Sequence, residues 1–353
     1  MPGEVSLNET LHAGPNLNPD VLDLLMQFRA HEIVLTADPE KAFLQIALDA
    51  CDRTHYAFSG MRLTPKASQP FPRVETLRMP REASLLYRQA RDILLEAGMK
   101  LVKRTSNDMK LRTLFQDEGT ASTSTTPLRK VLGLNWDIDS DEIQLSVKSL
   151  TEFLERQVDT KRYVLQAVSR IYNALGYVAP YVITPKILLQ RIWLTKLQWD
   201  DQLPEALMDT WHRWCQEVPT LSDFRVPRRL SGVSAPLQES TQSLYVFSDA
   251  NTKAYGAAVY LVLQSDDGNI EISLVLAKTR VAALGTLSLP RLELMAAVLA
   301  SRLVKFVRTK LSLVHVKTIL WTDSTIDLYW IHGFPMGSKP FVQNRVTEIR
   351  TTT

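Results

Sequence analysis

The stretch YVFSDANTKAYGAAVYL, residues 245–261, decides the fold predicted for the C-terminal third of the chain. An apolar and aromatic run ends at Asp249, and a second run follows Gly256 after a short polar turn. Apolar runs of this length, separated by turn residues, predict two neighbouring strands. Aspartate at a strand end commonly caps a turn, but it is also a ligand for hard cations. The stretch therefore predicts a pair of strands with a carboxylate at the end of the first.

The elements predicted around this stretch form an α/β domain. Three strands are followed by a helix, a fourth strand and a second helix, and this order suits a sheet in which the fourth strand runs parallel to the first. The strands are predicted at 244–248, 255–263, 270–277 and 316–322, and the helices run from Pro290 to about Lys310 and from Ser324 onward.

Three carboxylates occupy particular places in this domain: Asp249, Glu293 and Asp323. Asp249 follows the first strand and Asp323 follows the fourth, so parallel pairing of these strands would bring the two acids together. Glu293 lies in the first turns of the helix that Pro290 opens. Carboxylate oxygens are the ligands that Mg²⁺ prefers, and two such ions about 3.5 to 4 Å apart activate water and stabilise the leaving oxygen of a phosphodiester. The alternative is that Asp249 and Asp323 only cap turns.

The first part of the chain predicts a mixed architecture. Residues 32–48 are strand-like up to Leu35, after which Asp38 and Pro39 suit the start of a helix. Another helix is predicted over 83–98, with Gly98 just past its end. Two strands are predicted around a turn at 139–141.

The pattern from 160 to 219 is helical. One helix is predicted to end at Gly176, and the next to begin with Thr184 as its N-cap and Pro185 as its first residue. A third helix follows Pro204, with a buried stripe that favours a core role for its tryptophans over base stacking. That stripe consists of Leu207, Trp211 and Trp214.

Composition limits the function classes. A chain of 353 residues is long enough for two or three domains, and 45% hydrophobic with 22% charged residues is typical of a soluble globular protein. No apolar run approaches the ~20 residues that cross a bilayer, and no secretory signal is visible, so we expect an intracellular protein, cytoplasmic or nuclear. Two distant cysteines favour neither a disulfide framework nor a zinc site. A net charge of +3 permits an anionic partner.

Long motifs resemble a known family. FSDANTKAYGAAVYL, AKTRVAALGTLSLPRLELMAAVLASRLVKFV and ILWTDSTIDLYWIHG resemble the ribonuclease H region of a Bel/Pao-type retrotransposon polyprotein. VLGLNWDIDSDEI and TKRYVLQAVSRIYNALGYVAP resemble its connecting region, and LTADPEKAFLQIAL resembles the first palm motif of its reverse transcriptase. The resemblance covers most of residues 28–350 and implies an α/β and α+β multidomain chain. The implied parts are a degenerate palm remnant (1–118), a connecting region (127–230) and a truncated ribonuclease H-like domain (243–353).

The resemblance also implies roles for single residues in the palm remnant. Asp38 matches the first metal-binding aspartate of the polymerase, and Phe43 matches the aromatic residue that excludes the 2′-hydroxyl of an incoming nucleotide. The family's Tyr-x-Asp-Asp turn has no counterpart here, and a proline-rich join at 59–73 stands in its place. Both matches are therefore interpreted as vestigial, and no polymerase activity is expected.

For the ribonuclease H-like part, the resemblance implies hydrolysis of RNA in RNA–DNA hybrids with Mg²⁺ or Mn²⁺ held by Asp249, Glu293 and Asp323. The family's fourth carboxylate is expected beyond Thr353. The alternative is a catalytically dead nucleic-acid-binding or interaction relic. Other retroelement polyprotein chains are further candidate partners. An aspartic peptidase is not supported, because Asp-Ser-Asp at 139–141 and Asp-Ser-Thr at 323–325 lack the glycine of that motif.

Nucleic-acid contact is predicted along the helix that carries Glu293. Arg302, Lys305, Arg308 and Lys310 lie on this helix and could follow a phosphate backbone. A solvated helix face explains the same residues equally well.

Overall fold

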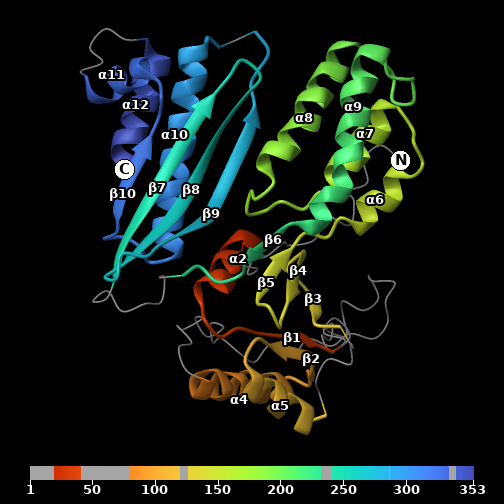
Figure 1. The fold of residues 1–353 in the computed structure, drawn as a ribbon, viewed down its shortest axis with the longest axis vertical. Coiled ribbons are helices and arrows are strands. Elements are labelled where there is room, and N and C mark those ends of the chain that lie inside the picture. The colour runs from red at the N-terminus through yellow and green to blue at the C-terminus, as the bar shows by residue number, and fades with distance from the viewer. Residues whose placement is uncertain (1–19, 41–79, 120–125, 232–239, 286, 334–338) are drawn as a thin grey trace, which may run out of the picture.

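The computed structural model describes residues 20–40, 80–119, 126–231, 240–285, 287–333 and 339–353. Figure 1 shows three regions: a sheet with helices at upper left, a group of helices at upper right, and two small sheets with helices below. The mixed α/β and α+β class predicted from the sequence is confirmed. Among the described residues, no helix is both long and apolar enough to span a membrane.

The C-terminal sheet contains four strands in the order β10-β7-β8-β9. β7 and β8 pair antiparallel, β8 and β9 pair antiparallel, and β10 lies parallel to β7 with Trp321 opposite Phe247. The predicted parallel pairing of the first and fourth strands is therefore confirmed. The bounds are β7 (Ser240–Ala250), β8 (Ala254–Ser265), β9 (Ile270–Val281) and β10 (Lys317–Trp321).

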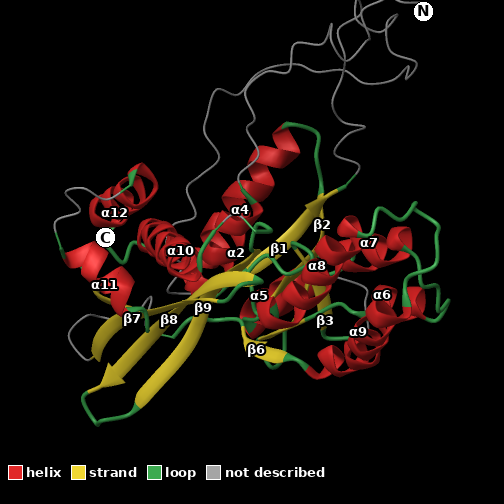
Figure 2. Cartoon of the chain, turned by 90° about the horizontal axis from the view of Figure 1, so that it is seen from above, coloured by secondary structure: helices red, strands yellow, loops and turns green. Residues whose placement is uncertain are grey.

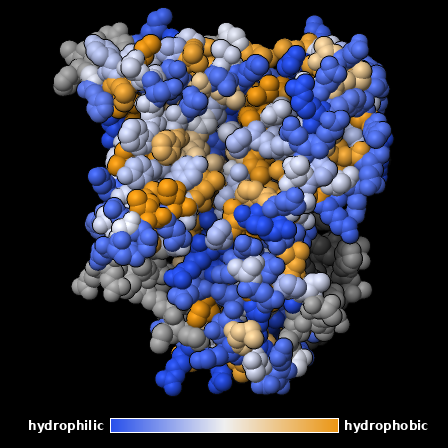
Figure 3. Space-filling model, in the orientation of Figure 1, coloured by the Kyte–Doolittle hydropathy of each residue, from blue (hydrophilic) through white to orange (hydrophobic). Residues whose placement is uncertain are grey.

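Three helices lie on one side of this sheet: α10 (Leu289–Lys310) packs on the strands, and α11 (Thr325–His332) and α12 (Pro340–Thr352) pack on α10 (Figure 2). Alternation along β7 turns Leu244 and Val246 into the core under α10, while Phe247 remains 48% exposed. Figure 3 shows apolar residues at the surface where the strands face the viewer. The sheet therefore has one buried face and one partly open face.

The connecting region consists of helices, but two predicted boundaries are wrong. α7 ends at Ser169 rather than at Gly176, because the chain turns away to bring Leu175 into a backbone hydrogen bond with Ala277 of β9. The bounds are α6 (Lys148–Leu154), α7 (Lys161–Ser169), α8 (Ala179–Leu194), α9 (Glu205–Glu217) and the 3₁₀ helix η1 (Val218–Asp223).

The second wrong boundary is the start of α8. This helix begins at Ala179, so Thr184 is not its N-cap and Pro185 lies inside it. Proline cannot donate to the carbonyl four residues earlier. Here that carbonyl, on Tyr181, accepts a hydrogen bond of 3.3 Å from the Trp214 indole instead. Trp211 and Trp214 are 1% and 2% exposed, so their predicted core role is confirmed.

The lower part of Figure 1 holds two small sheets, one from residues 35–106 and one from residues 128–227 of the predicted connecting region. Asp38 and Pro39 lie within β1, where they pair with Val102 and Leu101, so the predicted start of a helix at Pro39 is wrong. Pairing with β2 extends the strand past Leu35. The elements are α2 (Val21–Ala30), β1 (Leu35–Pro39), α4 (Pro80–Glu96), β2 (Leu101–Ser106) and α5 (Met109–Asp117), and the second sheet is β3 (Leu128–Val131), β4 (Leu134–Asp137), β5 (Glu142–Gln144) and β6 (Arg225–Pro227).

One hydrophobic core joins residues from all three predicted parts. Leu25 and Met26 of α2, Leu175 and Val182 of the connecting region, and the buried faces of β7–β9 belong to the same cluster. Arg29 of α2 is 2% exposed and donates to the backbone carbonyls of Leu274 and Val275 in β9. The N-terminal part is therefore packed directly on the C-terminal sheet. The predicted domain boundaries stay predictions.

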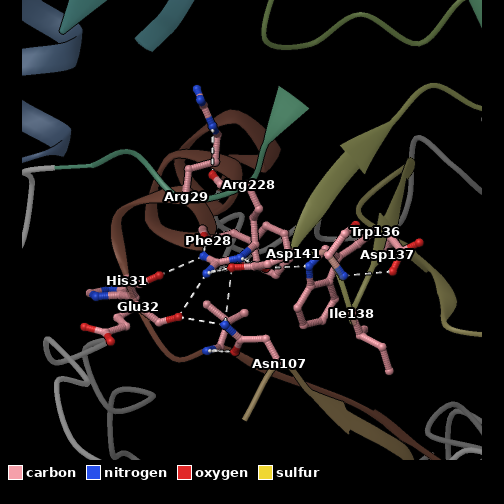
Figure 4. A network of polar contacts seen from close by, with 12 residues as sticks. Phe28, Arg29, His31, Glu32, Asn107, Trp136, Asp137, Ile138, Asp141 and Arg228 are labelled. Carbon is pink, nitrogen blue, oxygen red and sulfur yellow. Dashed lines mark hydrogen bonds and ion pairs between the residues drawn. The ribbon is translucent and has the colours of Figure 1, made fainter. Parts of the chain in front are cut away.

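A buried arginine links the N-terminal part to the second small sheet (Figure 4). Arg228 is fully buried and makes a two-pronged ion pair with Asp141, at 2.6 and 2.7 Å. It also donates to the backbone carbonyls of Phe28, His31 and Glu32. Charge-assisted bonds of this kind are the strong ones in a dry environment. Arg228 therefore holds the end of α2 against the β4–β5 turn.

His31 makes the stability of this region depend on pH. Its ring is buried, its two nitrogens have no hydrogen-bond partner in the described structure, and Figure 4 shows it pointing away from the ion pair. Burial, and then the charge of Arg228, lower the pKa of His31 from its ordinary value of 6.5. Below pH 6.5 the unfolded chain takes up a proton that the folded chain refuses, so we expect stability to fall as pH drops from about 6.5 to 5.

The measurement is urea unfolding across this pH range, for the wild type and His31→Leu. We expect the variant to lose the part of the slope that belongs to His31. Equal slopes for both proteins would show that His31 does not titrate in this way.

Candidate active site at the carboxyl ends of β7 and β10

Two of the three predicted acids lie in one cavity. Trp321 and Phe247 are register partners, and Asp323 and Asp249 each follow two residues later. Both aspartates are exposed, and both line a cavity of about 710 Å³. The parallel pairing of β10 with β7 places them there, as the topology argument from the sequence predicted.

The rest of the cavity wall is mostly apolar. It includes the Phe247 and Trp321 rings, which lie nearly parallel at 11° with their centroids 6.4 Å apart. None of the described residues that line this cavity is basic. Two exposed carboxylates without a basic neighbour in the wall attract cations, and nothing in the wall competes for them.

Glu293 does not line this cavity and instead contacts Ser324 at the start of α11. It is half-buried in the first turns of α10, and its Oε2 accepts a hydrogen bond of 2.7 Å from Ser324 Oγ. Ser324 directly follows Asp323 and caps α11 by accepting from the Asp327 N–H at 3.2 Å. Glu293 is therefore connected to the end of β10 through Ser324 rather than by lining the cavity.

The acids fit one hydrated cation better than an all-protein cage. Within the part of the chain that the structure describes, no three His, Cys, Asp or Glu side chains are arranged to hold a metal ion. Mg²⁺, however, usually keeps several waters and needs only one or two carboxylates besides substrate phosphates. Asp249 and Asp323 meet that requirement, and the predicted three-acid set stays a prediction.

The sequence reasoning missed Asp327. This residue is fully buried, and neither of its carboxylate oxygens has a hydrogen-bond partner in the described structure. Burial, and then the charge of Glu293, raise the pKa of Asp327 to about 7. Its place in the first turn of α11, four residues after Asp323, was the available signal. The acidic region is therefore larger than the three residues predicted.

The predicted nucleic-acid residues have structural partners. Arg302 makes an ion pair with Glu348 of α12, which raises the Arg302 pKa. Arg308 donates to the carbonyl of Val314, while Lys305 is exposed. Lys310 forms an ion pair with Asp23 of α2. Three of the four cations are thus engaged within the fold, and their contact with nucleic acid stays a prediction.

Of the two predicted polymerase residues, the structure describes only Asp38, which falls outside this site. Asp38 is exposed in β1 and pairs with Lys103 at 3.4 Å. Phe43 lies outside the described residues. Asp38 is not part of the site at the ends of β7 and β10, because β1 belongs to a different sheet.

Comparison with known families explains this arrangement. Residues 160–324 match the family model described as the Pao retrotransposon-like RNaseH-like domain. This segment is therefore similar to the Pao retrotransposon family. The Pao segment, as we call residues 160–324, contains Asp249, Glu293 and Asp323, and its match confirms the resemblance predicted from the sequence. It begins in the connecting helices and ends beside α11.

A solved structure has the same fold at low sequence identity. It is the foamy viral protease-reverse transcriptase dRH in complex with double-stranded DNA, similar with a TM-score of 0.54 and 11% identity. The similarity covers 96% of this chain but 58% of the foamy viral chain, so this chain corresponds to part of that protein. No curated protein matches the sequence.

Proposed function

We propose that the Pao segment carries a ribonuclease H-like activity that hydrolyses the RNA strand of RNA–DNA hybrids with Mg²⁺ or Mn²⁺. One observation carries the proposal: Asp249 and Asp323 end two adjacent parallel strands and line the same cavity. Carboxylates at this position, in a wall without basic residues, suit a hydrated cation that in turn takes a phosphate oxygen.

The proposal gives a distinct task to each residue of the site. Asp249 and Asp323 hold the cation, and the Ala250 N–H, which donates to Asp249 Oδ1 at 2.6 Å, orients the first carboxylate. Ser324 holds Glu293 beside them through its hydroxyl. A bound Mg²⁺ would supply the charge that lowers the pKa of an attacking water and stabilises the leaving oxygen.

The N-terminal part has no polymerase role in this proposal. Its one matched acid in the described structure, Asp38, is exposed and paired with a lysine. The sequence also lacks the Tyr-x-Asp-Asp turn that would supply the other acids. We therefore expect no nucleotide incorporation on a primed template.

The test is cleavage of a labelled RNA–DNA hybrid in Mg²⁺ and in Mn²⁺. We expect Asp249→Asn to slow cleavage at least tenfold, because each catalytic carboxylate supports charge that develops in the transition state. Asp266→Asn is the matched control: it removes the same charge from an exposed turn outside the cavity and should leave the rate unchanged.

The competing function is that of a catalytically dead nucleic-acid binder. No cleavage by the folded wild-type chain in either metal would reject the hydrolytic proposal. If that chain still bound the hybrid, the binding function would be the better description.

A further inference from the structure

A groove between the connecting helices and the C-terminal sheet has an unusual charge composition. It has a volume of about 780 Å³ and is lined by residues of α7, α8, β9 and α10. None of the described residues that line it is acidic. Its basic residues are Lys186, Lys278, Arg280 and Arg302.

We propose that this groove binds the sugar–phosphate backbone of a nucleic acid through Lys186, Lys278 and Arg280. The proposal rests on the nucleic-acid partner of the proposed function, but it does not require catalysis. We call this set of residues the basic groove.

The three cations are available for an external partner. All are exposed, and within the described structure none makes an ion pair or a side-chain hydrogen bond. Arg302 differs, because it already forms two hydrogen bonds with Glu348. The basic groove therefore has positive charge that the fold does not neutralise.

The positions of the cations suit an extended anion. Lys278 and Arg280 are two residues apart on β9, so their side chains leave the same face of the strand about 7 Å apart. Lys186 reaches the groove from α8, on the connecting helices. A ligand that contacts all three must bridge α8 and β9, which suits an extended polyanionic backbone.

The groove adjoins the acidic cavity. Ala179, Ala277 and Thr279 line both hollows, so the two meet around the start of α8 and the middle of β9. Figure 1 shows α8 beside β9 at this junction. Lys278 is the register partner of Ala257, whereas Asp249 is that of Gly256, so the β9 cations and Asp249 lie on opposite faces of the sheet. A backbone held by the cations would pass around the edge strand β9 to reach the acidic cavity, whose own wall contains no basic residue.

Close packing gives the groove a defined shape. Leu175 and Ala277 are joined by a backbone hydrogen bond of 3.0 Å, and the Gln190 amide donates to the Ala282 carbonyl at 2.7 Å. These contacts hold α8 against β9, so the cations of the two elements keep a constant relation. Pre-organised charges bind a polyanion at a lower entropic cost.

The experiment measures binding of the full chain to a fluorescent RNA–DNA hybrid by anisotropy, without divalent cations and over a range of salt concentrations. The groove variant carries Lys186→Gln, Lys278→Gln and Arg280→Gln. We expect its affinity at low salt to fall at least tenfold. The plot of log K against log salt should become less steep. The magnitude of its negative slope should fall by about two to three, since each lost phosphate contact removes about 0.9.

The control variant carries Arg88→Gln, Lys100→Gln and Lys110→Gln, three exposed residues of the N-terminal part with the same total charge change. We expect it to keep nearly all of the affinity and the slope. Equal losses in both variants, wild-type binding by the groove variant, or no binding by the wild type would each overturn the proposal.

Binding and cleavage separate this proposal from the hydrolytic one. If the wild type binds through the basic groove but does not cleave, the groove stands and the hydrolytic function falls. If the groove variant binds like the wild type and Asp249→Asn alone stops cleavage, the groove proposal falls and the hydrolytic function stands.

Discussion

Replacing Arg228 with methionine is expected to lower the free energy of unfolding by about 3 kcal/mol, the lower end of the range for breaking a buried ion pair. The guanidinium is fully buried, and its removal leaves the Asp141 carboxylate without its cationic partner and takes a donor from the carbonyls of Phe28 and His31. Trp136 and Asn107 still donate to Asp141. The lower end applies because the Asp141 side chain is 28% exposed and water can reach it. Urea unfolding followed by circular dichroism measures the change.

The neighbouring residue provides the control for Arg228→Met. Arg229 pairs with Glu32 at 3.3 Å, but its side chain is 37% exposed. Exposed pairs contribute about 0 to 1 kcal/mol, so Arg229→Met should be nearly neutral. Similar effects from both variants would contradict the view that burial makes Arg228 the link between α2 and the β4–β5 turn.

Replacing Gly176 with alanine is expected to destabilise the protein by roughly 2 to 4 kcal/mol, through steric overlap and backbone strain together. An added Cβ would lie 1.8 Å from the carbonyl oxygen of Ala277, and the backbone has a φ of +79°. The clash falls on backbone of β9, which cannot move without disturbing the sheet. The Leu175–Ala277 hydrogen bond should be lost with it. Thermal unfolding measures the loss.

Gly268→Ala separates the two causes. Gly268 also has a positive φ, +87°, but an added Cβ there meets nothing within 4 Å. This variant should therefore show only the conformational cost, about 1 to 2 kcal/mol. If Gly176→Ala were no worse than Gly268→Ala, the close contact between the connecting region and β9 would not exist in solution.

The local sequence pattern was sufficient to predict the C-terminal sheet and the positions of Asp249 and Asp323 in it. The strands around Asp249 and Asp323 alternate or run apolar, and the rule for parallel connections then places their carboxyl ends together. Pairing lengthened the strands beyond their predicted ends, because backbone hydrogen bonds to a neighbour extend a strand without any further apolar residues.

The local sequence pattern gave a wrong prediction where a residue far along the chain supplied a hydrogen-bond or strand partner. Pro185 looks like the first residue of a helix, yet α8 continues through it because Trp214 donates to the carbonyl that Pro185 leaves free. Pro39 looks like a helix start, yet β2 pairs with it as part of a strand. Neither partner can be recognised from the neighbouring sequence.

The sequence by itself determined the order of the elements in the C-terminal sheet, the similarity of residues 160–324 to the Pao family and the approach of Asp249 to Asp323. Only the tertiary structure decided that Glu293 bonds to Ser324, that Asp327 is buried, and which cations remain without a partner. The physical reason is the distance along the chain over which each feature is set. Strand alternation is set by neighbouring residues, and strand topology follows a general rule. The rotation of a helix and the pairing of a charge depend instead on side chains far along the chain.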